Sequence, residues 1–215
     1  MGRRKKEPKS VHREKIASAA SALFMEKGIA ATSMDDIAKA AGYSKATLYV
    51  YFENKEEIIG LLVLESMKKL YDYIASALEQ QESTKNRYHC ICQALVRYRE
   101  EFPFYFKMVL DKINIDFEDQ DYLPEEKETY LVGEEINKKL KDFLVAGMEK
   151  GDLRDDLEIM PTLFNLWGML AGIIQLAANK EEYMKSAMGL SQMQFLEYGF
   201  SMLYDSIAAV GRVQR

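Results

Sequence analysis

The segment GYSKATLYVYFENKEE, residues 42–57, places hydroxyl groups, small side chains and ammonium groups close together. Tyrosine and threonine hydroxyls and lysine ammonium groups donate hydrogen bonds to anionic oxygens, and compact side chains let a backbone come near a partner. A surface built from these groups is suited to an anionic partner. Which anion it fits depends on the elements that display the groups.

Three helices are predicted around this segment, and the second and third of them are short. Apolar residues from Ile16 to Phe24 follow the helical i, i+3, i+4 spacing and predict a helix over 11–27. Ser33 with Asp36 has capping-box spacing and starts a helix over 34–41 that Gly42 can end. Ser44 can then cap a third short helix.

The predicted third helix has one buried side, formed by Leu48 and Phe52 one turn apart. Its outward residues are then Lys45, Ala46, Thr47, Tyr49 and Val50. Two short helices joined by a tight turn, the second displaying small and hydroxyl-bearing side chains, are the outline of a helix-turn-helix.

Duplex DNA fits the chemistry of these residues. Ala46 and Thr47 are compact enough to enter a major groove, where a methyl can touch thymine and a hydroxyl can bond to a base edge. Tyr49 and Tyr51 offer hydroxyls to phosphate, and Lys55 adds a positive charge near a helix N-terminus. Residues 1–55 also carry 11 Lys and Arg against 6 Asp and Glu, which gives a basic head on an acidic chain.

The segment SMDDIAKAAGYSKATLYVYFENKEEII resembles the DNA-binding motif of the TetR family of one-component transcriptional regulators. The resemblance is specific over residues 10–60 and is one of architecture only beyond residue 60. The residues at the family's spacing are Ile37, Ala38, Gly42, Ser44, Thr47, Leu48, Tyr49, Tyr51, Phe52, Lys55 and Glu56.

Family membership implies that different parts of the chain have different functions. It implies that the first three helices bind DNA, that a variable helical domain binds an inducer, and that the last two helices build most of a dimer. By position, Thr47, Tyr49, Tyr51 and Lys55 match the family's DNA-contacting residues, whereas Lys45 and Ala46 lie where operator preference varies. Ser44, before this helix, is included in the expected DNA-binding set.

Asp35 departs from the pattern, because some family members carry a base-reading basic residue there. A carboxylate can accept a hydrogen bond from cytosine N4 but repels phosphate, and near a helix N-terminus it also stabilises the helix. The basic segment RRKKEPK, residues 3–9, is open to two interpretations, an arm that reaches DNA or a solvated tail.

The rest of the chain is predicted to be helical. Residues 56–215 are expected to form an all-α ligand-binding and dimerisation domain, and residues 1–55 the DNA-binding domain with its basic arm. Expected helices cover residues 54–80, 86–100, 102–113, 124–149, 158–178 and 188–210, with loops at 114–123 and 151–157. No signal peptide is recognisable, which predicts a cytoplasmic protein.

The segment 159–179 contains no charged residue. It is long enough to span a membrane, but its internal polar residues and the absence of a basic flank weaken that interpretation. Gly168 and Gly172 would let another helix approach closely, and the final helix offers Phe195, Leu196, Gly199, Met202, Leu203 and Ile207 as its partner stripe. We expect a homodimer through residues 158–178 and 188–210.

A small, mostly apolar inducer is expected in the helical body, because pockets in bundles lie between helices. The candidate contacts are Tyr98, Tyr105, Phe106, Trp167 and Met169. The same aromatic and methionine side chains could instead be ordinary core.

No catalytic, cofactor or metal site is predicted. His89, Cys90 and Cys92 on one helix cannot converge on a metal, the acidic stretch from Asp111 to Glu128 lacks the pattern of a calcium loop, and no nucleophile has a base at motif spacing. The sequence therefore predicts a ligand-responsive repressor that binds a palindromic operator as a dimer. An activator or co-ligand-dependent regulator of the same fold, and a membrane-associated or protein-interaction helical protein, are the alternatives.

Overall fold

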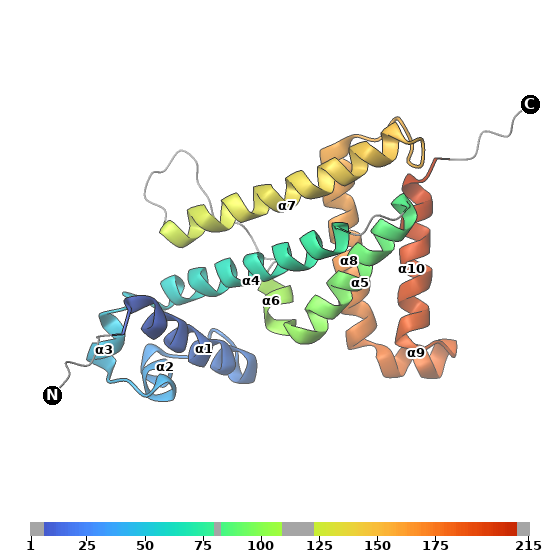
Figure 1. Cartoon of the computed structure of the whole chain (residues 1–215). Helices are drawn as coiled ribbons and strands as arrows, with labels where there is room; N and C mark the ends of the chain where they lie inside the picture. Colours follow the sequence, from blue (N-terminus) through green and yellow to red (C-terminus); the bar gives the residue numbers. More distant parts are fainter. Residues whose placement is uncertain (1–6, 80–82, 109–122, 210–215) are drawn as a thin grey trace, which may run out of the picture. The chain divides into compact units, whose positions relative to one another are not determined.

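The computed structural model describes residues 7–79, 83–108 and 123–209, and in these ranges the chain is built of α-helices without a named strand (Figure 1). The all-α fold class, an N-terminal helix-turn-helix followed by a larger helical part, is confirmed. The helices are α1 Lys9–Lys27, α2 Met34–Ala41, α3 Lys45–Tyr49, α4 Lys55–Leu78, α5 Thr84–Glu101, α6 Pro103–Met108, α7 Pro124–Glu149, α8 Ile159–Asn179, α9 Glu181–Met188 and α10 Gln192–Ile207.

The predicted helix boundaries agree with these to within about two residues, with one exception. The expected final helix over 188–210 starts too early, because Gly189 adopts a left-handed φ of 67° and ends the separate helix α9. Ser191 then caps α10 with a capping box to Gln194. The end of the helix expected over 102–113, nearly all of the loop expected over 114–123 and most of the basic arm lie outside the described residues.

Two compact units make up the chain. The first contains residues 1–67 and 104–130, and the second contains residues 68–103 and 131–215. Helices α4 and α7 each contribute residues to both units. The predicted functional boundary after residue 55 stays a prediction, since packing units alone do not say which part binds what.

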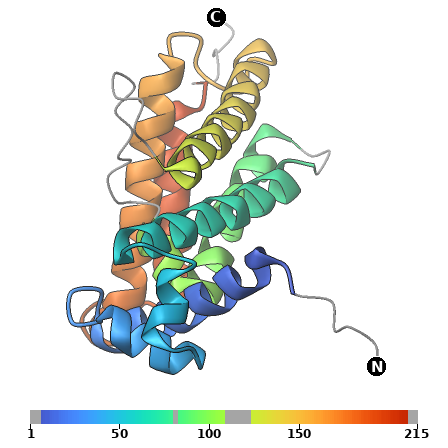
Figure 2. The same cartoon turned by 90° about the vertical axis from the view of Figure 1, so that its left-hand side faces the viewer.

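The first unit has its own apolar core. Helices α1, α2 and α3 lie side by side in both Figure 1 and Figure 2, and α1 packs on α2, which packs on α3. Fully buried side chains come from each of them, from the turn after α3 and from the start of α4: Ile16, Ala17, Ala20, Ile37, Leu48, Phe52, Ile58 and Leu62. The apolar stripe predicted for α1 is therefore the stripe that the unit buries.

Local hydrogen bonds set the start of each short helix. Ser33 and Asp36 form the predicted capping box at α2, and the Asn54 side chain accepts a hydrogen bond from Glu57 N at 2.9 Å near the start of α4. Between α2 and α3 the chain turns at Gly42, whose φ of 76° is strained for any residue with a Cβ atom. Two helices of eight and five residues are in this way joined by a tight turn.

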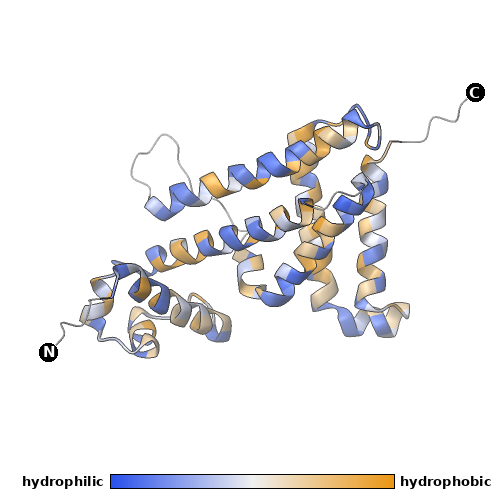
Figure 3. Ribbon diagram, viewed as in Figure 1, coloured by the Kyte–Doolittle hydropathy of each residue, from blue (hydrophilic) through white to orange (hydrophobic). Residues whose placement is uncertain are grey.

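In the second unit, α8 packs against α5, α9 and α10. The hydroxyl of Tyr88 on α5 donates a hydrogen bond to the carbonyl of Phe200 on α10 at 3.1 Å. A Cβ atom at Gly199 would lie 3.2 Å from Ile173, so α10 and α8 approach closely there. Helix α8 is long and apolar enough to cross a membrane by length and composition, as its colour in Figure 3 indicates, and 28% of its most apolar window is buried.

We expect Asp36→Asn to remove a pH-dependent contribution to stability. Hydrogen bonds from Lys27 and Ser33 hold the pKa of Asp36 well below its ordinary 3.8. A lowered folded-state pKa contributes stability that is present above the ordinary value and is lost as pH falls towards the folded one. Urea unfolding followed by circular dichroism should show the variant less stable at pH 7, with the difference shrinking below about pH 4.

Asp142→Asn is the matched control, because this exposed carboxylate lies on α7 and takes no part in the cap. A difference between wild type and Asp36→Asn that stayed constant from pH 7 to pH 2.5 would contradict the electrostatic origin.

Candidate nucleic-acid interface

The outward surface of α3 is the candidate interface. Leu48 is fully buried, whereas Tyr49 and Val50 are 45% and 66% exposed. Lys45 and Ala46 are also exposed, and Thr47 is half-buried. The helix therefore presents the face that its sequence predicts, with compact residues at its N-terminus, where helix-turn-helix proteins contact base edges.

Ser44 and Thr47 form the N-cap of α3. The Ser44 hydroxyl oxygen accepts a hydrogen bond from Thr47 N at 3.1 Å and lies 2.7 Å from the Thr47 hydroxyl oxygen. Capping satisfies one of the amides that a helix start leaves unpaired. Both residues hold the helix start in place, and their hydroxyls remain at its surface.

Arg13 on α1 contacts Tyr51 and Phe52, the residues that follow α3. This role was not predicted from the sequence. The Arg13 guanidinium donates a hydrogen bond to the Tyr51 carbonyl at 2.7 Å, lies 4.2 Å from the centre of the Phe52 ring, and pairs with the Glu125 carboxylate. A signal was available, because Arg13 falls three residues before Ile16 on the buried stripe of α1. A charged residue on such a stripe indicates a specific partner.

Tyr51 is also more constrained than its sequence position suggests. Its ring is half-buried and lies 5.1 Å from the ring of His12, which hydrogen-bonds the Tyr43 hydroxyl at 2.7 Å. These contacts fix the turn after α3. Contact of the Tyr51 hydroxyl with DNA stays a prediction.

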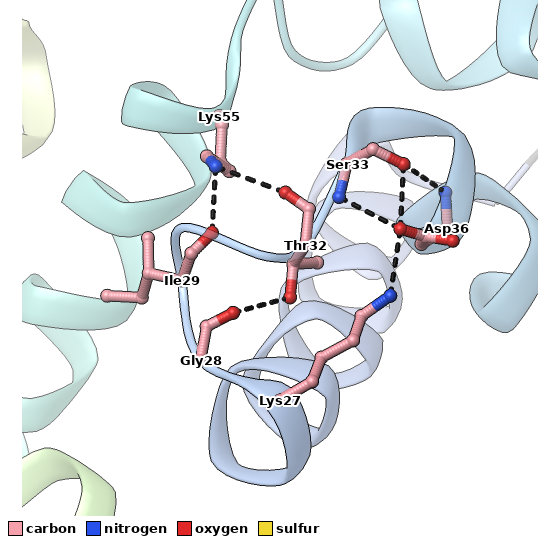
Figure 4. A network of polar contacts seen from close by, with 7 residues as sticks. All are labelled: Lys27, Gly28, Ile29, Thr32, Ser33, Asp36 and Lys55. Carbon is pink, nitrogen blue, oxygen red and sulfur yellow. Dashed lines mark hydrogen bonds and ion pairs between the residues drawn. The ribbon is translucent and has the colours of Figure 1, made fainter.

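Lys55 ties α4 to the loop between α1 and α2. Its ammonium donates hydrogen bonds to the carbonyls of Ile29 at 2.8 Å and Thr32 at 3.1 Å, as Figure 4 shows. The Thr32 hydroxyl in turn donates to the Gly28 carbonyl at 2.8 Å. An ammonium has three N–H donors, so these two bonds use two of them.

Asp35 and Lys45 form an ion pair across the two helices of the motif. Lys45 Nζ lies 2.8 Å from Asp35 Oδ1, and both side chains are 61% exposed. The hydrogen bond from Lys45 to Asp35 raises the pKa of Lys45. Asp36, and not Asp35, supplies the capping-box carboxylate of α2.

The second unit contains a small apolar cavity of about 40 Å³. Two of its lining residues carry a polar group, Tyr88 and Trp167. The Tyr88 hydroxyl is bonded to Phe200, and burial raises the pKa of Tyr88. The lining residues come from α4, α5, α7 and α8: Ile74, Tyr88, Ile91, Leu95, Leu140, Phe143, Leu144, Leu163, Leu166, Trp167 and Leu170.

Of the residues expected to contact a ligand, Trp167 lines this cavity and the others do not. Tyr98 is fully buried against Tyr73 in the second unit, at a ring distance of 5.5 Å. Tyr105 and Phe106 belong to the first unit. Met169 is 41% exposed and lines an open hollow between α8 and α10. Aromatic content predicted these residues, but which helix faces meet depends on packing.

The described residues contain no group of three or more His, Cys, Asp or Glu side chains that could hold a metal ion. Cys90 is half-buried and Cys92 is buried, and burial raises the pKa of the Cys92 thiol to about 12. A thiol with this pKa is a poor nucleophile near neutral pH.

We expect Lys55→Met to loosen the loop between α1 and α2. The change removes two charge-assisted hydrogen bonds and keeps the length of the side chain. Amide hydrogen exchange in residues 28–33 should become about tenfold faster, which corresponds to ~1.4 kcal/mol. Lys39→Met, at an exposed position on α2, is the control. Equal exchange in both variants would assign Lys55 no positioning role.

Known proteins with a similar sequence or structure also contain a DNA-binding motif at this place in the chain. The family described as "Bacterial regulatory proteins, tetR family" matches residues 16–61, which hold the helix-turn-helix. TtgR from Pseudomonas putida, a transcriptional regulator, is 37% identical over 82 residues, and the match spans 38% of this chain and 39% of TtgR.

Two further matches extend over nearly the whole chain. IcaR from Staphylococcus aureus, a negative regulator of a biofilm operon, is 26% identical over 202 residues, which cover 89% of this chain and 96% of IcaR. The crystal structure of the TetR family regulator PfmR from Thermus thermophilus is 27% identical, covers 93% of this chain and 97% of PfmR, and has a TM-score of 0.66. The chain thus carries the DNA-binding motif of the TetR family over residues 16–61 and is similar over nearly its whole length to a TetR family regulator.

Proposed function

We propose that this protein is a cytoplasmic repressor that binds a palindromic DNA operator as a homodimer and is released by a small, mostly apolar inducer. The observation that carries the proposal is the outward face of α3, which is held at its start by Ser44 and at its end by Arg13. A recognition helix held at both ends keeps its side chains in one arrangement for the major groove.

The roles of the DNA-binding residues follow from their position and chemistry. Ala46 and Thr47, at the start of α3, are the proposed base-contacting residues, and the exposed methyl groups of Val50 can meet a thymine methyl. Tyr49 offers its hydroxyl to phosphate. Tyr51 and Lys55 are proposed to contact phosphate from the edges of the motif.

The apolar surfaces of α8 and α10 support a dimer. Met160, Phe164 and Leu176 on α8 are 40%, 57% and 48% exposed, and with Gly168 and Gly172 they form a row at i, i+4 spacing along the helix. A Cβ atom at either glycine would meet nothing within 4 Å, so another helix has room to approach closely.

The stripe expected from the sequence of α10 faces outward only in part. Leu196, Leu203 and Ile207 are buried within the unit, whereas Met202, a member of that stripe, is 57% exposed and Tyr198, outside it, is 68% exposed. Large exposed apolar patches mark interaction sites, and a second copy would cover both helices at once. Two copies would also supply the two recognition helices that a palindrome requires.

The apolar cavity supports an uncharged inducer, or one that inserts an apolar part. The lining offers no charged side chain among the described residues, and its Tyr88 hydroxyl is already bonded to Phe200. Binding sites for small molecules usually measure about 300–1,000 Å³, far more than the 40 Å³ seen here. An inducer must therefore separate the cavity-lining helices, and it can act on DNA binding only by preferring the conformation with the weaker DNA affinity.

Fluorescence anisotropy tests the DNA-binding proposal. The protein should bind a labelled duplex from upstream of its own gene at least about 1,000-fold more tightly than a scrambled duplex, at physiological salt. Tyr49→Phe should weaken binding to both duplexes by about fivefold, because it removes one neutral hydrogen bond to phosphate.

Tyr183→Phe on α9 is the matched control, since this tyrosine is 61% exposed outside the first unit. Equal, weak binding of the wild type to every duplex, including a random library, would refute the regulator proposal.

We expect Phe164→Lys to disrupt the dimer. A lysine on the exposed face of α8 would place like charges near the two-fold axis and remove a large apolar contact. Sedimentation velocity should show the dimer dissociation constant raised by at least about tenfold. Met25→Lys, at a position 58% exposed on α1, should leave it unchanged. A wild type that stayed monomeric at micromolar concentration would contradict the α8 and α10 interface.

A further inference from the structure

The ion pair between Asp35 and Lys45 lies on the candidate interface, and neither of its residues supplies a helix cap. Asp36 already caps α2, and Ser44 already caps α3. An ion pair between side chains that are both 61% exposed contributes little to folding stability, because water screens it. A carboxylate at this position also repels phosphate, so it works against DNA binding in general.

We propose that Asp35 and Lys45 together determine sequence specificity by reading one G·C base pair in each half-site and by suppressing binding to other DNA. The inference rests on the proposed DNA-binding function. An interface that only attracted phosphate would have no use for the Asp35 carboxylate, whereas a base-reading interface would.

The chemistry of one base pair matches the pair of side chains. In the major groove guanine presents the acceptors O6 and N7, and the paired cytosine presents the N4 amino donor. The Lys45 ammonium donates, and the Asp35 carboxylate only accepts. With Nζ and Oδ1 2.8 Å apart, the two groups can keep their mutual hydrogen bond while each takes its partner on the same base pair.

An A·T pair satisfies the two groups less well. Adenine N6 can donate to the carboxylate, but the order of donors and acceptors along the groove differs, and the thymine methyl occupies space beside O4. At a non-specific site Lys45 can turn to phosphate, but Asp35 then stays unpaired in a strongly negative field. The pair therefore adds no net charge to non-specific binding and lowers affinity for wrong sequences.

Selection from a random duplex library tests the inference, because such a library contains every candidate half-site. Wild type, Asp35→Asn, Asp35→Ala and Glu149→Gln should be compared at two salt concentrations. The wild type and Glu149→Gln should select G·C at one position of each half-site. Asp35→Ala should lose that preference by about tenfold, and Asp35→Asn should accept A·T there, because an amide pairs with adenine N6 and N7.

Affinity for a scrambled duplex gives a second readout. Both Asp35 variants should bind it about three- to tenfold more tightly than the wild type at low salt, with a salt dependence steeper by about one counterion per protomer. Glu149→Gln makes the same change in net charge on α7, outside the first unit. It should change neither the affinity for the scrambled duplex nor the salt dependence of that affinity. Asp35 is exposed and outside the cap, so the variants are expected to fold, which circular dichroism checks.

The possible results distinguish failure of the inference from failure of the proposed function. Asp35 variants that select the same bases as Glu149→Gln and bind scrambled DNA with the same affinity would overturn the inference, because the pair would then be an ordinary surface ion pair. A wild type that selects no sequence at all would refute the proposed function, and the inference with it, before any variant is measured.

Discussion

The arrangement of the first unit depends on contacts that stabilise α3, a helix too short to be stable by itself. Helix α3 has five residues, and so short a helix is unstable alone because nucleation costs more than one turn of hydrogen bonds returns. Burial of Leu48 and Phe52 anchors it from below, the Ser44 hydroxyl caps its start, and Arg13 binds the carbonyl of Tyr51 beyond its end. With these contacts supplied by neighbours, α3 keeps its place while Ala46, Tyr49 and Val50 remain exposed.

The second unit depends on one helix that is apolar on nearly every side. Inward, α8 packs on α5 and α10 and lines the apolar cavity. Outward, it leaves Phe164 and two open glycines exposed. The same composition that resembles a membrane segment is thus divided between core, cavity and an uncovered surface. In the proposed repressor, a ligand in the cavity would act on this helix and, through it, on the proposed dimer surface.

Polar contacts in the first unit show how far residue types alone can be interpreted. Lysine and aspartate near a recognition helix indicate charge, but they do not reveal which of them are paired. Lys55 donates to two loop carbonyls, Asp36 serves the cap with Lys27, and Asp35 is paired with Lys45. Each of these pairs joins residues from different elements, so each depends on how the helices cross.

The sequence by itself determined most of the helical elements, the caps at Ser33 and Ser44, the buried side of α3 and the resemblance to the TetR family, because these depend on neighbours along the chain. It could not determine that Arg13 supports α3, that α9 is separate from α10, or that the cavity gathers Trp167 with Phe143 while Tyr98 and Met169 lie elsewhere. Those outcomes depend on packing. A helical period fixes which residues share a face, but only tertiary contact decides what that face meets.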